Sequence, residues 1–63
     1  MVSEEPNVAR RGRYSTTQTY KLLGISYNSL MKYLKEGRIT AENGTTMGRY
    51  FYGESILNFW RAR

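Results

Sequence analysis

Cysteine, histidine and aspartate are absent from this 63-residue sequence. Without cysteine the fold has no disulfide, and without cysteine or histidine it lacks the usual ligands of a structural metal site. A catalytic carboxylate pair would need several glutamates to converge. The glutamates are instead spread along the chain, as Glu4, Glu5, Glu36, Glu42 and Glu54. We therefore expect no enzyme activity, no cofactor and no bound metal, and a fold that depends on its apolar core.

Long apolar runs are missing as well. No segment approaches the length of a membrane span or of the apolar part of a signal peptide. The sequence therefore predicts a cytoplasmic protein that makes no contact with a membrane.

Positive charge is in excess. Ten lysines and arginines against five glutamates give a formal net charge of +5, and the isoelectric point lies near 9.9. In so small a chain this excess favours a polyanionic partner such as nucleic acid. A basic surface also serves solubility, so the fold pattern has to decide between these two explanations.

The chain divides at about residue 13. Residues 1–13 carry scattered charges, the single proline and a glycine, without any apolar period. This composition is typical of a flexible arm, acidic at its front and basic at its end, where Arg10, Arg11 and Arg13 stand. Residues 14–63 are expected to form one domain.

The first helix is predicted from its two ends. Ser15-Thr16-Thr17-Gln18 has the form of a capping box, and Gly24 suits the left-handed position that ends a helix. We expect a helix from Thr16 to Leu23. Its buried residues should be Thr19, Leu22 and Leu23.

A second helix should follow after a tight turn through Gly24 and Ile25. Ser26 is a second N-cap, and Gly37 fits the position after the last turn, so the helix should run over 27–36. At 100° per residue, one face is apolar and the opposite face polar. The apolar face holds Leu30, Tyr33 and Leu34. The polar face holds Asn28, Lys32 and Lys35, with Ser29 and Met31 at its margins.

The rest of the chain predicts a hairpin and a third helix. Residues 38–42 and 49–52 are rich in β-branched and aromatic side chains, and 43–48 form a turn-rich tip between them. The last helix should run from Glu54 to about Arg61. Its core face would carry Ile56, Phe59 and Trp60. The predicted fold is thus mainly α with a small β-hairpin, in the order helix, turn, helix, hairpin, helix.

This order is typical of proteins whose second helix enters the DNA major groove while the hairpin tip, or wing, lies along the backbone. The chain resembles the excisionase and MerR-like winged helix-turn-helix family. The resemblance rests on Tyr14 to Gln18, on Leu22-Leu23-Gly24-Ile25-Ser26, on Leu30, on Lys35-Glu36-Gly37-Arg38-Ile39, and on Phe51, Ile56 and Phe59.

Two departures from the family pattern stand out. The family usually has small alanines where this chain has Thr19 and Tyr20, so Tyr20 must swing outward or widen the helix packing. MerR-type activators continue into a long dimerisation helix, whereas this chain ends at Arg63. It therefore looks more like an excisionase or a small phage or plasmid regulator.

The resemblance implies a protein that binds and bends DNA at recombination sites, often as cooperative neighbouring copies of a monomer, to promote excision. Double-stranded DNA and an integrase or recombinase would be its partners, and the nucleoid its place in the cytoplasm. A transcriptional repressor is the alternative within this class. A protein-interaction module that binds an acidic partner is the alternative of another class.

Candidate DNA contacts follow on the second helix. Asn28 is a candidate to recognise an adenine edge, and Lys32 and Lys35 to meet phosphates or a guanine. Met31 lies at the margin of the same face. Tyr27 and Ser29 stand at the helix start, where phosphate binds readily, although Ser29 also suits a purely capping role.

Further candidates lie in the hairpin and the arm. Thr45, Thr46 and Arg49 are placed to touch the DNA backbone or minor groove, and Arg10, Arg11 and Arg13 to follow phosphates as a basic arm. Residues 50–52, three aromatics in a row, also suggest a stacking platform for single-stranded bases. Core packing is the favoured explanation for them, because one hairpin is too narrow for a platform.

Overall fold

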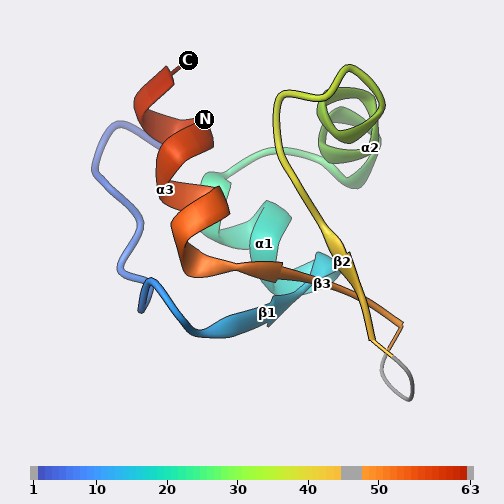
Figure 1. Ribbon diagram of the computed structural model, residues 1–63. Helices are drawn as coiled ribbons and strands as arrows, with labels where there is room; N and C mark the ends of the chain where they lie inside the picture. The colour runs from blue at the N-terminus through green and yellow to red at the C-terminus, as the bar shows by residue number, and fades with distance from the viewer. Residues whose placement is uncertain (1, 45–47, 63) are drawn as a thin grey trace.

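The computed structural model describes residues 2–44 and 48–62. Within these ranges the chain forms three helices and one three-stranded antiparallel sheet in the order β1-β3-β2 (Figure 1). In chain order the elements are β1 Arg13–Ser15, α1 Thr16–Leu23, α2 Tyr27–Lys35, β2 Glu42–Asn43, β3 Arg49–Tyr52 and α3 Gly53–Ala62. The fold is therefore mixed α/β, where the sequence predicts a mainly α protein with only a hairpin.

Helix α1 has the predicted bounds because both of its ends are capped. The Gln18 amide donates to the Ser15 hydroxyl over 3.2 Å, and the Ser15 amide donates to the Gln18 side chain over 3.0 Å. Gly24 ends the helix in the left-handed conformation, with φ 69° and ψ 35°, which a residue with a Cβ adopts only at a cost. The capping box and the glycine stop are both confirmed.

Helix α2 begins as predicted and ends one residue early. The Ser29 amide donates to the Ser26 hydroxyl over 3.1 Å, which caps the start. The helix ends at Lys35 with Glu36 as its C-cap. The Gly37 amide still donates to the Leu34 carbonyl, and the Arg38 amide to the Tyr33 carbonyl. The chain therefore makes a tight turn at the end of α2 before it runs toward the sheet.

This turn explains why the first hairpin strand is shorter than predicted. Of the expected strand over 38–42, only Glu42 pairs with β3, together with Asn43. Residue Ile39 is 3% exposed and packs into the core instead of extending the sheet. The prediction of a strand over 38–42 is therefore wrong for residues 38–41, because the end of α2 and the core hold them away from β3.

The second edge of β3 is occupied by a strand that the sequence pattern did not indicate. Strand β1 pairs antiparallel with β3, with Arg13 opposite Tyr52, Tyr14 opposite Phe51 and Ser15 opposite Tyr50. Strand β3 thus lies in the middle of the sheet. Its last residue is followed directly by α3, which begins at Gly53.

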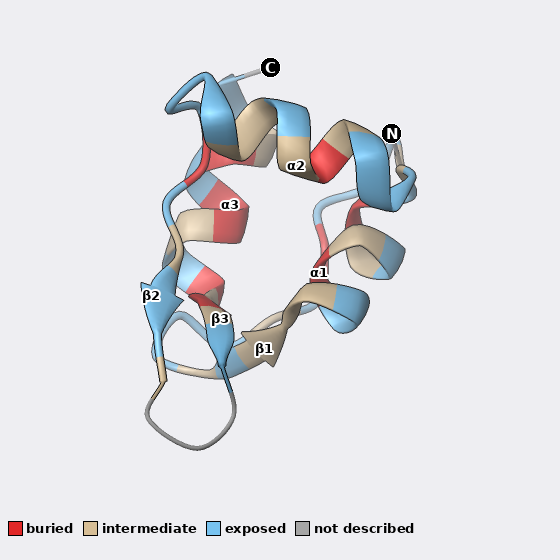
Figure 2. Cartoon of the chain, turned by 90° about the vertical axis from the view of Figure 1, so that its right-hand side faces the viewer, coloured by how far each residue is buried: buried red, intermediate tan, exposed pale blue. Residues whose placement is uncertain are grey.

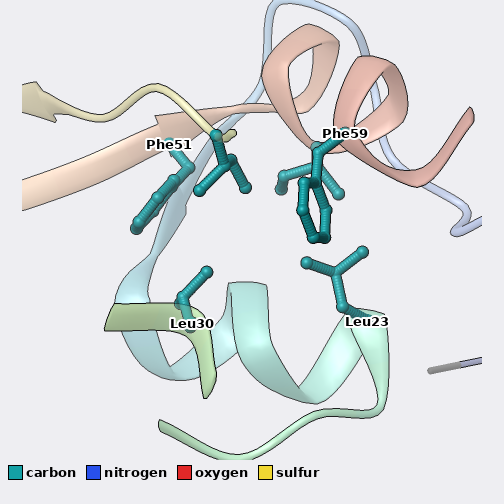
Figure 3. Close-up of a cluster of buried hydrophobic side chains, with 6 residues drawn as sticks. Leu23, Leu30, Phe51 and Phe59 are labelled. Carbon is teal, nitrogen blue, oxygen red and sulfur yellow. The ribbon is translucent and has the colours of Figure 1, made fainter. Parts of the chain in front are cut away.

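The core gathers one or two side chains from each of several elements (Figure 3). It consists of Leu23, Leu30, Ile39, Phe51, Ile56 and Phe59. Leu57 is also buried, although the predicted core face of the last helix does not include it. Thr19 is fully buried, and its hydroxyl donates to the Ser15 carbonyl over 2.8 Å, so this buried polar group has a hydrogen-bond partner.

The segment before β1 is packed, where its composition predicts a flexible arm. Figure 1 shows it running along α3. The Val2 amide donates to the Leu23 carbonyl, and the Trp60 indole donates to the Val2 carbonyl over 3.0 Å. Arg61 forms an ion pair with Glu5 at 3.1 Å. Pro6 is buried. The apolar side chains that anchor this segment follow no helix or strand period, so pattern analysis does not detect them.

Truncating Leu30 to alanine should destabilise the fold strongly. Its side chain is fully buried, and such a change costs about 2–5 kcal/mol of unfolding free energy because it leaves a cavity. Leu22→Ala is the matched control. Leu22 is only partly buried, so water can fill the space that its side chain leaves. Urea unfolding followed by circular dichroism measures both. Equal losses in the two variants would contradict the assignment of Leu30 to the core.

Candidate nucleic-acid interface

Helix α2 presents one face to the core and another to solvent. Leu30 is fully buried, and Tyr33 and Leu34 pack partly buried against the core cluster. On the opposite side Asn28, Lys32 and Lys35 are exposed, and Tyr27 is exposed at the helix start. Figure 2 looks onto α2 with the hairpin below it. The predicted division of this helix into an anchoring and a solvent face is confirmed.

The start of α2 is braced by an aromatic pair. The rings of Tyr20 and Tyr27 meet edge to face with their centroids 6.2 Å apart. Tyr20 is half-buried against the core cluster, and Tyr27 is 52% exposed. Tyr20 therefore stays between α1 and α2 and does not swing outward. It packs against the first turn of the helix that carries the candidate contacts.

Ser29 belongs to the cap rather than to the exposed face. Its amide donates to the Ser26 hydroxyl oxygen, and the Ser26 hydroxyl donates to that of Ser29 over 3.0 Å. Ser29 is also half-buried. Of the two roles that the sequence leaves open for this residue, the geometry favours capping.

Besides the core packing of Phe51, a polar side-chain contact links the hairpin to α2. A guanidinium nitrogen of Arg49, at the start of β3, lies 3.3 Å from the Met31 sulfur. A thioether is a weak acceptor, but this contact holds an exposed cation beside the solvent face of α2. Thr45 and Thr46, the other hairpin candidates, lie outside the described residues.

Arg38 adds a cation near the end of α2 that the sequence interpretation did not single out. It forms an ion pair with Glu36 at 3.1 Å, and its guanidinium lies 5.7 Å from the centroid of the Tyr33 ring. Its position just after the helix is the signal that was available. The neighbouring carboxylate offsets much of its charge, so it contributes less than Lys32 or Lys35 to the local potential.

The basic residues before and within β1 lie apart from α2. Side chains alternate along a strand, so Arg49 and Phe51 share the face of β3 toward α2, and Tyr50 and Tyr52 share the other. Arg13 is directly opposite Tyr52 in the ladder, and its guanidinium lies 5.2 Å from the Tyr50 ring centroid. With Arg10 and Arg11 it lines a pocket beside Tyr52 and α3. The sequence-predicted contact set is thus split between the two sides of the sheet.

The aromatic run over 50–52 does not form a flat platform. Phe51 is fully buried, and the rings of Tyr50 and Tyr52 stand edge to face, 87° apart, with centroids 5.5 Å apart. Arg13 covers the Tyr50 ring. The pKa of the Tyr50 hydroxyl is raised above 10.0, mainly by a hydrogen bond with Tyr52 and to a smaller extent by desolvation. The tyrosine rings thus pack against each other and against Arg13, and this arrangement disfavours the stacking of successive nucleic-acid bases on them.

Among residues 2–44 and 48–62, no three His, Cys, Asp or Glu side chains gather where a metal ion could bind. In the same ranges, every helix is too short or too polar to cross a bilayer. No family model, curated protein or solved structure matches the chain.

Replacing Tyr52 by phenylalanine should lower the pKa of Tyr50 toward 10.0, because it removes the hydrogen bond that favours the neutral phenol. In the wild type, the raised pKa means that the folded state favours protonated Tyr50. The contribution of Tyr50 to the stability of the fold is complete at pH values below its pKa in the unfolded chain. It is lost as the pH rises through its pKa in the folded protein. A carbon-13 titration of labelled tyrosines measures the shift, with Tyr27→Phe as the control. An unchanged Tyr50 titration in Tyr52→Phe would contradict the assigned cause.

Proposed function

We propose that this chain is a non-enzymatic winged helix-turn-helix protein that binds duplex DNA sequence-specifically. Helix α2 would enter the major groove, and the β2–β3 hairpin would be the wing. The observation that carries the proposal is the exposed polar face of α2, with Asn28, Lys32 and Lys35, on a helix whose other side is fixed in the core. Arg49 of the hairpin contacts the same helix.

The chemistry of this face suits DNA better than an enzyme substrate. The major groove is about 12 Å wide and admits one helix. An asparagine amide matches the donor and acceptor of an adenine edge, and lysines match phosphates. Among the described residues, no carboxylate pairs with Lys32 or Lys35, since the two ion pairs are Arg38–Glu36 and Arg61–Glu5. The face is therefore electrostatically open to a polyanion.

We further propose that the protein acts as an excisionase-like directionality factor, which binds and bends DNA at attachment sites beside an integrase or recombinase. The family resemblance and the small number of lysines on α2 support this. Two lysines give a modest phosphate contribution, so neighbouring copies on DNA would add to it. An excision assay with the cognate integrase would separate this role from that of a repressor, which needs only operator binding.

The lysines of α2 should contribute sequence-independent affinity. Lys32→Ala and Lys35→Ala should each weaken binding to every duplex and lower the salt slope of the binding constant by about 1. Lys21→Ala is the matched control, because it removes one exposed charge from α1. Gel shifts across a salt series measure these effects. If both variants bind every duplex as tightly as wild type does, the proposal is wrong.

Asn28 should instead contribute sequence preference. Its loss in Asn28→Ala should relax discrimination at one base pair by about 1–3 kcal/mol, because one amide recognises one base edge. Selection of bound sequences from a random duplex library measures the preference. Asn7→Ala is the control, since Asn7 is exposed outside α2. The same selected sequences for Asn28→Ala and wild type would remove Asn28 from the recognition set.

A further inference from the structure

A second basic surface lies on the other side of the sheet from α2. An open pocket of about 530 Å³ is formed where the segment before β1 meets β3 and α3. Its cationic and neutral polar lining consists of Arg10, Arg11, Arg13, Tyr52, Ser55 and Asn58. Glu54 is the one carboxylate in this lining. Three arginines therefore line one hollow, together with neutral hydrogen-bonding residues.

The arginine segment is held in place by backbone contacts. The Gly53 amide donates to the Gly12 carbonyl, and the Glu54 amide donates to the Arg10 carbonyl, each over 2.9 Å. Gly53 is buried, and a Cβ at this position would collide with the Ala9 carbonyl. The close approach fixes residues 9–12 on the first turn of α3. The arginines thus project from a docked segment, and less ordering is needed when they bind an anion.

These guanidiniums have no carboxylate partner among the described residues, where the ion pairs involve Arg38 and Arg61. Of the three arginines as the structure describes them, Arg13 has a ring contact, with Tyr50. An arginine fork matches the paired oxygens of a phosphodiester, and a row of them matches a backbone that carries many such groups. The pocket is therefore suited to a strand of phosphates more than to an isolated carboxylate.

The two basic surfaces point in different directions. Arg49 lies on the face of β3 that contacts α2 through Met31, and Arg13 lies on the face with Tyr50 and Tyr52. In Figure 1 the segment before β1 lies on the left of the molecule and α2 on the right. The pocket therefore faces away from a duplex that would be seated on α2.

We propose that the pocket of Arg10, Arg11 and Arg13 binds the phosphodiester backbone of a second DNA segment, so that one chain bridges two duplexes. The inference rests on the proposed function of α2. It assigns the arginines to a separate contact rather than to the duplex that α2 recognises, and it requires no self-association.

A bridging assay tests the proposal. A selected duplex is immobilised, the full chain is added, and retention of a second, fluorescent duplex is measured. Wild type should retain it, and Arg10→Gln/Arg11→Gln should lower retention at least tenfold while it binds the first duplex within about twofold of wild type, because a row of phosphate contacts dominates such affinity. Glu54→Gln should increase retention. Lys21→Gln, the charge control, should behave as wild type.

Other outcomes have defined meanings. If wild type binds the immobilised duplex but retains no second one, or if the double variant retains it fully, the bridging proposal fails and the function of α2 stands. If the double variant weakens binding to the first duplex as much as Lys32→Ala does, α2 and the arginine pocket bind the same duplex, and the bridging proposal is wrong. The bridging proposal is also wrong if light scattering finds two chains in each bridged complex. It is wrong as well if polyglutamate releases the second duplex at a lower concentration than unlabelled duplex does. No binding to any duplex overturns the proposed function itself.

Discussion

Strand β3 is hydrogen-bonded along both edges, to β1 on one side and to β2 on the other, and the organisation of the molecule depends on it. Its central residue, Phe51, is fully buried and brings the sheet into the same core as Leu23 and Leu30 of the two helices. Because side chains alternate along a strand, the same residues that build the core also sort their neighbours to opposite sides. This alternation places Arg13 and Arg49 on opposite faces of the sheet.

Local chemistry made much of the helical structure predictable. Ser15 with Gln18, and Ser26 with Ser29, satisfy backbone amides within one turn, so each helix start follows from a few adjacent residues. Strand β1 was not predictable in this way. Its partner Tyr52 lies far along the chain from Arg13, and three residues carry too little alternation to show a period. Ile39 likewise looks like a strand residue, until the end of α2 draws it into the core.

The candidate interface shows the same division. The exposed face of α2 follows from helical periodicity, because Leu30 must point inward and Lys32 and Lys35 then cannot. The place of Arg10 and Arg11 did not follow from any period. It depends on a glycine that permits close approach and on contacts between Val2 and Trp60 and between Glu5 and Arg61. These are pairings between distant parts of the chain, for which one sequence carries no local signal.

The direct passage from β3 into α3, with Tyr52 the last strand residue and Gly53 the first helical one, leaves no loop that could act as a hinge. Because the segment over 9–12 is hydrogen-bonded to the same junction, β3, the last helix and the arginine segment are joined at one place. A change in the direction of β3 should therefore also move the arginine segment, because no residue separates the strand from the helix that holds this segment.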